Sequence, residues 1–167
     1  MYEVIYQQAE AYLEKFRQVN DGIGRTATAE EVQLLQEKFG DLIPQWYYRL
    51  ICQLPLIDAE VAWQAYEPDE DFDGLASVQF LAAEDMILES FEYDPGPMVR
   101  SNGYVCIATD PAGSGDSYYV KFDRPDPPVL LIYHDFYSKD GSLTEYDYET
   151  VAESLSGLFT NGIVPDF

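Results

Sequence analysis

The stretch GYVCIATDPAGSGDSYYVKF, residues 103–122, decides the fold. Residues 103–109 and 117–122 are rich in β-branched and aromatic side chains, which predicts two strands. The glycines between them do not indicate a phosphate loop, because no G-x-x-x-x-G-K-[ST] pattern occurs and Asp110 and Asp116 would repel a phosphate. A tight turn that joins two antiparallel strands is the better interpretation, and residues 128–134 predict a further strand.

Helical patterns precede these strands. Apolar residues recur at helical spacing within residues 2–19, which predicts a helix with one buried face. A second helix is expected to begin at Thr28, where Glu31 can complete a capping box. A third is expected to begin at Pro44 and to end before Pro55.

The other segments complete an α+β pattern. Residues 60–66 alternate like a half-buried strand, residues 77–81 predict a short strand, and residues 82–93 and about 147–159 predict helices. The order indicates an antiparallel sheet flanked by N-terminal helices and a C-terminal helix. No linker divides the chain, so we expect one domain over residues 1–167.

The composition predicts a packed core under an acidic surface. Of 167 residues, 47% are hydrophobic, and 31 acidic residues against nine Lys and Arg give a net charge of −22. Such a surface repels nucleic acid and anionic membranes, whose binding needs cationic side chains, and it attracts basic proteins. The alternative is that the acid excess only keeps the chain soluble.

Location is predicted from two further features of the sequence. The N-terminal residues lack the basic start and apolar run of a signal peptide, and no apolar stretch approaches the length of a bilayer span. We therefore expect a cytoplasmic protein. The two cysteines, Cys52 and Cys106, lie in apolar stretches and are expected to be buried reduced thiols.

The most acidic stretch is YEPDEDFDGL, residues 66–75. Its Asp69, Asp71, Asp73 and Gly74 match the first half of a calcium loop, but the twelfth position is Phe80, which cannot coordinate a metal. A weak calcium site over residues 69–80 is therefore the lesser alternative to a solvated acidic loop. In a third interpretation, the apolar ring at residue 72 among carboxylates grips a basic protein surface. No metal or cofactor is predicted.

Catalytic signals are weak. The single histidine, His134, neighbours Asp135, but adjacent strand residues point to opposite faces, so we expect a strand-end residue with a hydrogen-bonding role. No G-x-S-x-G nucleophile motif occurs, and with 31 acids any pair of carboxylates is uninformative. The sequence therefore does not predict an enzyme.

Residues 27–51, ATAEEVQLLQEKFGDLIPQWYYRLI, resemble the start of the SMI1/KNR4 (SUKH) superfamily. Its domains tend to open with a helix carrying paired Glu, then a G-x-x-[IL]-P step into a helix with Y-x-x-[LI]. The matching residues are Glu30, Glu31, Phe39, Gly40, Ile43, Pro44, Tyr48 and Ile51. Residues 103–122 look like the central hairpin of the family, and residues 127–136 are similar to its following strand.

The chain also departs from the family pattern. QLPLIDAE, residues 53–60, stands where the family often has an Asn-Gly step, and residues 1–25 add a helix to the core at residues 26–160. The resemblance implies a binding domain. Many bacterial members resemble intracellular immunity proteins that neutralise a toxin, often a nuclease, by stoichiometric binding. Eukaryotic relatives look like regulatory scaffolds, which gives the alternative function.

The expected contact surface combines the acidic loop with the turn of the central hairpin. An inhibitor that occupies the phosphate-binding cleft of a nuclease should be acidic, which fits the charge of this chain. The predicted partner is thus a basic protein toxin domain, and neither nucleic acid nor a membrane. The predicted contact residues are Glu67, Asp69, Glu70, Asp71, Phe72, Asp73, Asp116 and Tyr118.

Overall fold

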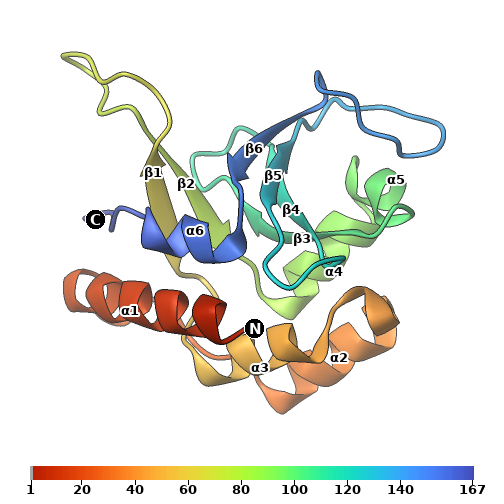
Figure 1. The fold of residues 1–167 in the computed structure, drawn as a ribbon, viewed down its shortest axis with the longest axis horizontal. Helices are drawn as coiled ribbons and strands as arrows, with labels where there is room; N and C mark the ends of the chain where they lie inside the picture. Colours follow the sequence, from red (N-terminus) through yellow and green to blue (C-terminus); the bar gives the residue numbers. More distant parts are fainter. Residues whose placement is uncertain (1) are drawn as a thin grey trace.

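The computed structural model describes residues 2–167 and has an α+β architecture built on one antiparallel sheet (Figure 1). Its six strands pair in sequence order, each with the next along the chain. The predicted α+β class and antiparallel sheet are confirmed. The strands are β1 (Glu60–Gln64), β2 (Leu75–Phe80), β3 (Tyr104–Thr109), β4 (Ser117–Lys121), β5 (Val129–Ile132) and β6 (Tyr148–Ala152).

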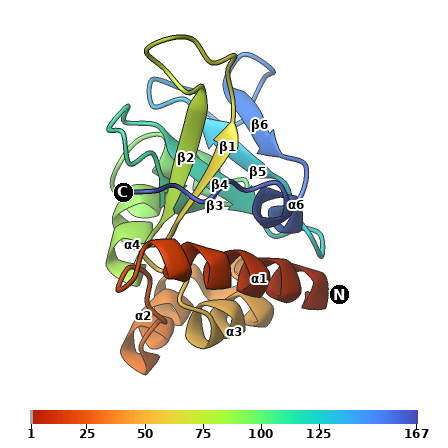
Figure 2. The same ribbon diagram turned by 90° about the vertical axis from the view of Figure 1, so that its left-hand side faces the viewer.

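Helices α1, α2 and α3 lie together below the sheet (Figure 2). The predicted capping box at the start of α2 is confirmed, because the Thr28 hydroxyl accepts the Glu31 N–H at 3.2 Å and the Glu31 carboxylate accepts the Thr28 N–H at 2.9 Å. The helices are α1 (Glu3–Val19), α2 (Ala29–Phe39), the 3-10 turn η1 (Gly40–Leu42), α3 (Gln45–Gln53), α4 (Ala83–Phe91), α5 (Gly96–Arg100) and α6 (Leu155–Thr160).

The C-terminal region differs from its prediction. The helix expected over residues 147–159 is wrong, because residues 148–152 form β6 and only residues 155–160 are helical. Thr150 and Val151 are β-branched and suit the strand, which pairs with β5. The helix begins after Ser154, whose hydroxyl accepts the Gly157 N–H at 3.0 Å.

The central strands bury both faces of the sheet. In β4, Val120 enters the main core, which the sheet shares with α1, α2, α3 and α6. Its neighbour Tyr119 points the other way, into a second core with Val99 of α5 and Phe136. Successive strand residues alternate between faces, so a central strand with two covered faces is apolar throughout.

The last residues close one end of the main core. After α6 the chain pairs with the outer edge of β1, where the backbones of Ile163 and Ala62 exchange hydrogen bonds of 2.7 and 3.2 Å. The Tyr12 hydroxyl of α1 donates to the Glu60 carbonyl at 2.8 Å. Helices α1 and α6 therefore cover one end of this sheet face, and the other end lies between the β1–β2 hairpin and β6 (Figure 1).

Two predictions from apolar stretches have outcomes in the structure. Both cysteines are free thiols, but only Cys106 is buried, so the expected burial of Cys52 is wrong. Within residues 2–167, none of the helices has the length and apolar character needed to cross a bilayer.

Candidate functional site

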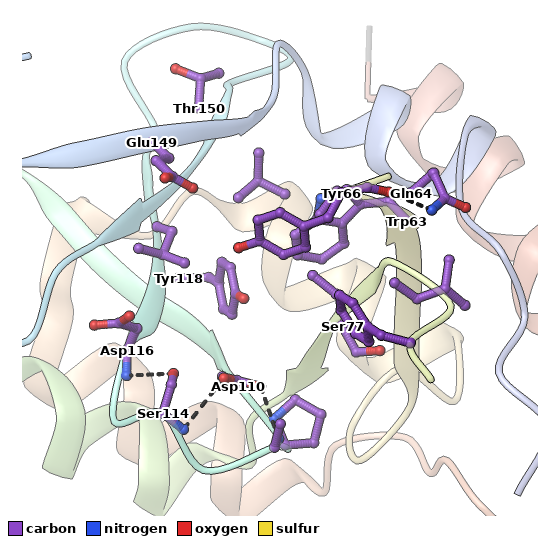
Figure 3. A pocket seen from close by; sticks show the side chains of 18 residues that line it. Trp63, Gln64, Tyr66, Ser77, Asp110, Ser114, Asp116, Tyr118, Glu149 and Thr150 are labelled. Atoms are coloured by element: carbon purple, nitrogen blue, oxygen red, sulfur yellow. Dashed lines mark hydrogen bonds between the residues drawn. The ribbon is translucent and has the colours of Figure 1, made fainter. Parts of the chain in front are cut away.

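A groove of about 620 Å³ opens on the sheet face that carries the main core, beyond the end covered by α1 and α6 (Figure 3). Four aromatic side chains line it: Trp63 of β1, Tyr66 and Phe72 of the β1–β2 loop, and Tyr118 of β4. The Trp63 and Tyr118 rings are perpendicular, with centroids 5.9 Å apart, and the Tyr66 and Phe72 rings lie 6.1 Å apart. The volume falls within the range of ordinary ligand pockets.

The register of the sheet sets the floor of the groove. Tyr118 lies opposite Leu131, and Leu131 lies opposite Glu149, so these three residues form one row across β4, β5 and β6. Directly paired residues share a face, which places Glu149 on the groove side of the sheet, two strands away from Tyr118. One row further in, Val120 belongs to the main core, so the groove continues the core outward.

Every charged residue that lines the groove among the described residues is an acid, namely Asp110, Asp116 and Glu149. The Asp110 carboxylate accepts the Ala112 N–H at 2.8 Å and so shapes the β3–β4 turn. One oxygen of Glu149 accepts the Tyr133 hydroxyl at 2.7 Å. The acids are thus held by local hydrogen bonds while their charge faces the groove.

The Tyr118 hydroxyl is the polar group at the floor of the groove. Tyr118 is only 2% exposed, yet its hydroxyl has no hydrogen-bond partner within residues 2–167. Burial, and then the negative charges of Asp110 and Asp116, raise the pKa of Tyr118. Among the described residues, the buried hydroxyls without a partner are those of Tyr48 and Tyr119, so the Tyr118 hydroxyl keeps its exposure at the groove, where a bound group can reach it.

The pKa of Tyr133 is raised by the same negative charges around the groove. The hydrogen bond to Glu149, followed by burial and by the charges of Glu149 and Asp116, raises the pKa of Tyr133 to about 12. Both tyrosines therefore keep their protons at neutral pH, and each hydroxyl can donate or accept a hydrogen bond.

The acidic loop extends the hairpin beyond the groove. The Asp69 carboxylate accepts the N–H groups of Asp71 and Phe72, each at 2.9 Å, and the Asp73 carboxylate accepts the Leu75 N–H at 3.0 Å. These are the turn-stabilising bonds expected of aspartate in loops. At the base of the loop, Gly74 has a φ of 76°, a conformation that favours glycine.

The same contacts argue against the calcium interpretation of residues 69–80. Asp69 and Asp73 are occupied by their own loop, and Phe80, at the twelfth position, is buried in β2 opposite Ala108. Among residues 2–167, no group of three or more His, Cys, Asp or Glu is arranged to hold a metal ion. The loop is an exposed acidic turn.

The predicted role of His134 is confirmed. It lies two residues after β5, and both its backbone nitrogen and its Nδ1 lie 2.9 Å from one Asp116 oxygen. Asp116, and not the neighbouring Asp135, is therefore its partner. This contact ties the β3–β4 turn to the end of β5 and fixes Asp116 at the groove margin.

The groove brings together three of the eight predicted contact residues: Phe72, Asp116 and Tyr118. The acids at positions 67, 69, 70, 71 and 73 stay on the exposed loop and do not line it. Trp63, Asp110 and Glu149 were not predicted. The alternation in residues 60–66 is a signal that could have placed Trp63 on the core-facing side. Glu149 was missed because residues 147–159 were predicted as a helix, whereas residues 148–152 form β6.

Comparison of the chain with models of protein families, with curated proteins and with solved structures finds no match. The resemblance to the SUKH superfamily therefore rests on the motifs in the sequence.

Proposed function

We propose that this protein is a binding protein that captures a basic protein partner through the groove and the acidic loop beside it. We further propose that the partner is a toxin domain and that the chain serves as an immunity protein, which neutralises the toxin by stoichiometric binding. The alternative is a regulatory scaffold with several partners.

The observation that carries the proposal is the chemistry of the groove. Its charged side chains are all acids, its walls are aromatic, and a loop with five further acids extends beyond it. Aromatic residues dominate the binding energy at protein interfaces, whereas peripheral charges speed association and choose the partner. The net charge of −22 strengthens steering toward a basic surface.

The immunity role adds the resemblance in sequence to this chemistry. A nuclease toxin is basic where it holds phosphate, so an acidic inhibitor can occupy that cleft. Such a role requires tight binding to one target and no turnover, which an aromatic groove with acidic margins can supply.

The test is capture of partners by the tagged full-length chain from its source cells, washed over a series of salt concentrations. The proposal predicts one basic partner, released as salt rises because ions screen the charges on both surfaces. That partner should be toxic when expressed alone and harmless when expressed with this chain. Several ordinary cellular proteins, or none at any salt, would refute the immunity role.

A further inference from the structure

The groove is built for a cation. It is lined by Asp110, Asp116 and Glu149, and no Lys, Arg or His among the described residues lines it beside them. Three carboxylates around one cavity repel anions and leave unneutralised negative charge at its margin. His134 contacts Asp116 from outside, with a side chain that is 57% exposed.

The walls of the groove favour a flat cation. The Trp63 and Tyr118 rings both line the cavity and meet at right angles, with an interplanar angle of 89°. Cations bind over aromatic faces, best over tryptophan, and a guanidinium also stacks on them because it is planar. An ammonium is a compact and strongly hydrated point charge, which gains less from such walls.

The hydrogen-bond acceptors are spread around the cavity. The Tyr118 hydroxyl lies on the floor without a partner among residues 2–167, Glu149 lies on β6, and Asp116 lies on the β3–β4 turn (Figure 3). The five N–H donors of a guanidinium are spread over three nitrogens in one plane, so they span acceptors farther apart than the three donors on a single ammonium nitrogen. Tyr118 is only 2% exposed as a residue, and its unpartnered hydroxyl is an observation independent of the acidic cluster.

We propose that the groove receives one arginine side chain of the partner protein, with its guanidinium against the Trp63 ring and its N–H groups donating to the Tyr118 hydroxyl and to Glu149. This assignment rests on the proposed function, since the basic partner supplies the side chain. It specifies the recognition: the arginine anchors the partner, and the acidic loop orients it.

The chain offers an internal control for the test, because it has two tryptophans. Trp63 lines the groove, whereas Trp46 packs against Phe122 at 5.5 Å outside it. In a ¹⁵N-labelled sample each indole N–H gives its own NMR signal. The probes are three capped tripeptides, Gly-Arg-Gly and its lysine and citrulline counterparts, each titrated into the full-length protein at millimolar concentrations.

The proposal predicts that the arginine peptide shifts the Trp63 signal in a saturable way and leaves the Trp46 signal in place. The lysine peptide should bind more weakly, and the citrulline peptide, which has the same shape without the charge, should have no effect. Tyr118→Phe and Glu149→Gln should each weaken arginine binding about tenfold, the effect of losing one charge-assisted hydrogen bond. Unfolding midpoints check that both variants fold.

A Trp63 signal that ignores the arginine peptide, or that responds equally to citrulline, would overturn this inference. A different result would refute the proposed function, namely that the wild-type chain captures no basic protein. A chain that captures a basic partner but does not respond to the arginine peptide would retain the proposed function and lose the arginine site.

Discussion

Two buried tyrosines give opposite predictions for the same substitution. Tyr12 is 4% exposed and Tyr118 is 2% exposed. The Tyr12 hydroxyl donates to the Glu60 carbonyl at 2.8 Å and lies 3.1 Å from the Ile163 carbonyl, whereas the Tyr118 hydroxyl has no partner within residues 2–167. Changing tyrosine to phenylalanine removes only the hydroxyl, so the two variants isolate the difference in hydrogen bonding.

The expected magnitudes follow from these contacts. Tyr12→Phe loses one net hydrogen bond, which lowers the free energy of unfolding by about 1 kcal/mol. For a chain of this size, the melting temperature should fall by roughly 2–4 °C. Tyr118→Phe removes a hydroxyl that makes no hydrogen bond within residues 2–167, so it should leave the stability close to unchanged.

The assay is urea unfolding followed by far-UV circular dichroism, with equal m-values as the check that only stability has changed. Tyr119→Phe is the matched control, because its hydroxyl also lacks a partner but is buried in the second core, away from the groove. Both Tyr118→Phe and Tyr119→Phe should keep or gain stability, and only Tyr118→Phe should weaken partner binding. A loss of stability in Tyr118→Phe equal to that in Tyr12→Phe would refute the reasoning.

Three further predictions concern the acidic loop and the start of α2. Gly74→Ala should destabilise the fold by more than about 2 kcal/mol, because the added Cβ would overlap the loop backbone. Gly22→Ala has open space around its Cβ and should cost only about 1 kcal/mol, for the same positive φ. Thermal unfolding of both variants compares them, and equal losses would contradict the overlap. Glu31→Gln should lower stability at pH 7 by about 1 kcal/mol relative to Glu30→Gln, since the half-exposed guanidinium that pairs with this carboxylate is screened by solvent. The Arg25 guanidinium lowers the pKa of Glu31 from 4.5 to about 2. The difference in stability between the two variants should therefore persist above pH 4.5 and shrink as pH falls toward 2. A difference that does not change with pH would count against the ion pair. Millimolar calcium should leave the melting temperature unchanged, because Asp69 and Asp73 already accept hydrogen bonds from their own loop and Phe80 stands at the twelfth position. A clear rise would restore the calcium site.

Local rules predicted most of the fold. The Thr28 capping box and the β-branched and aromatic residues of the strand around Tyr118 each depend on neighbours in sequence, and each agrees with the structure. The helix predicted over residues 148–152 was wrong because an exposed edge strand has little apolar alternation of its own. Its pairing with β5 decides its conformation. That pairing is a tertiary contact, and the hydrophobic periodicity of the sequence does not predict it.

The site was less predictable than the fold, for a related reason. The loop at residues 67–73 drew attention by its density of acids, yet only its Phe72 reaches the groove. The groove depends instead on curvature, which brings Trp63 of the first strand toward Glu149 of the last. Contacts between strands so far apart in sequence require the register of every strand between them.

The central claim is that the acidic aromatic groove binds the basic partner, and the most direct test is the dissociation constant of that partner for two variants of equal charge. Asp110→Asn with Glu149→Gln, and Glu10→Gln with Glu14→Gln on α1, each change the net charge from −22 to −20. The account predicts that the groove variant binds at least about tenfold more weakly, whereas the α1 variant stays within about twofold of wild type. Equal weakening in the two variants would contradict the account, because binding would then follow the total charge and not the groove.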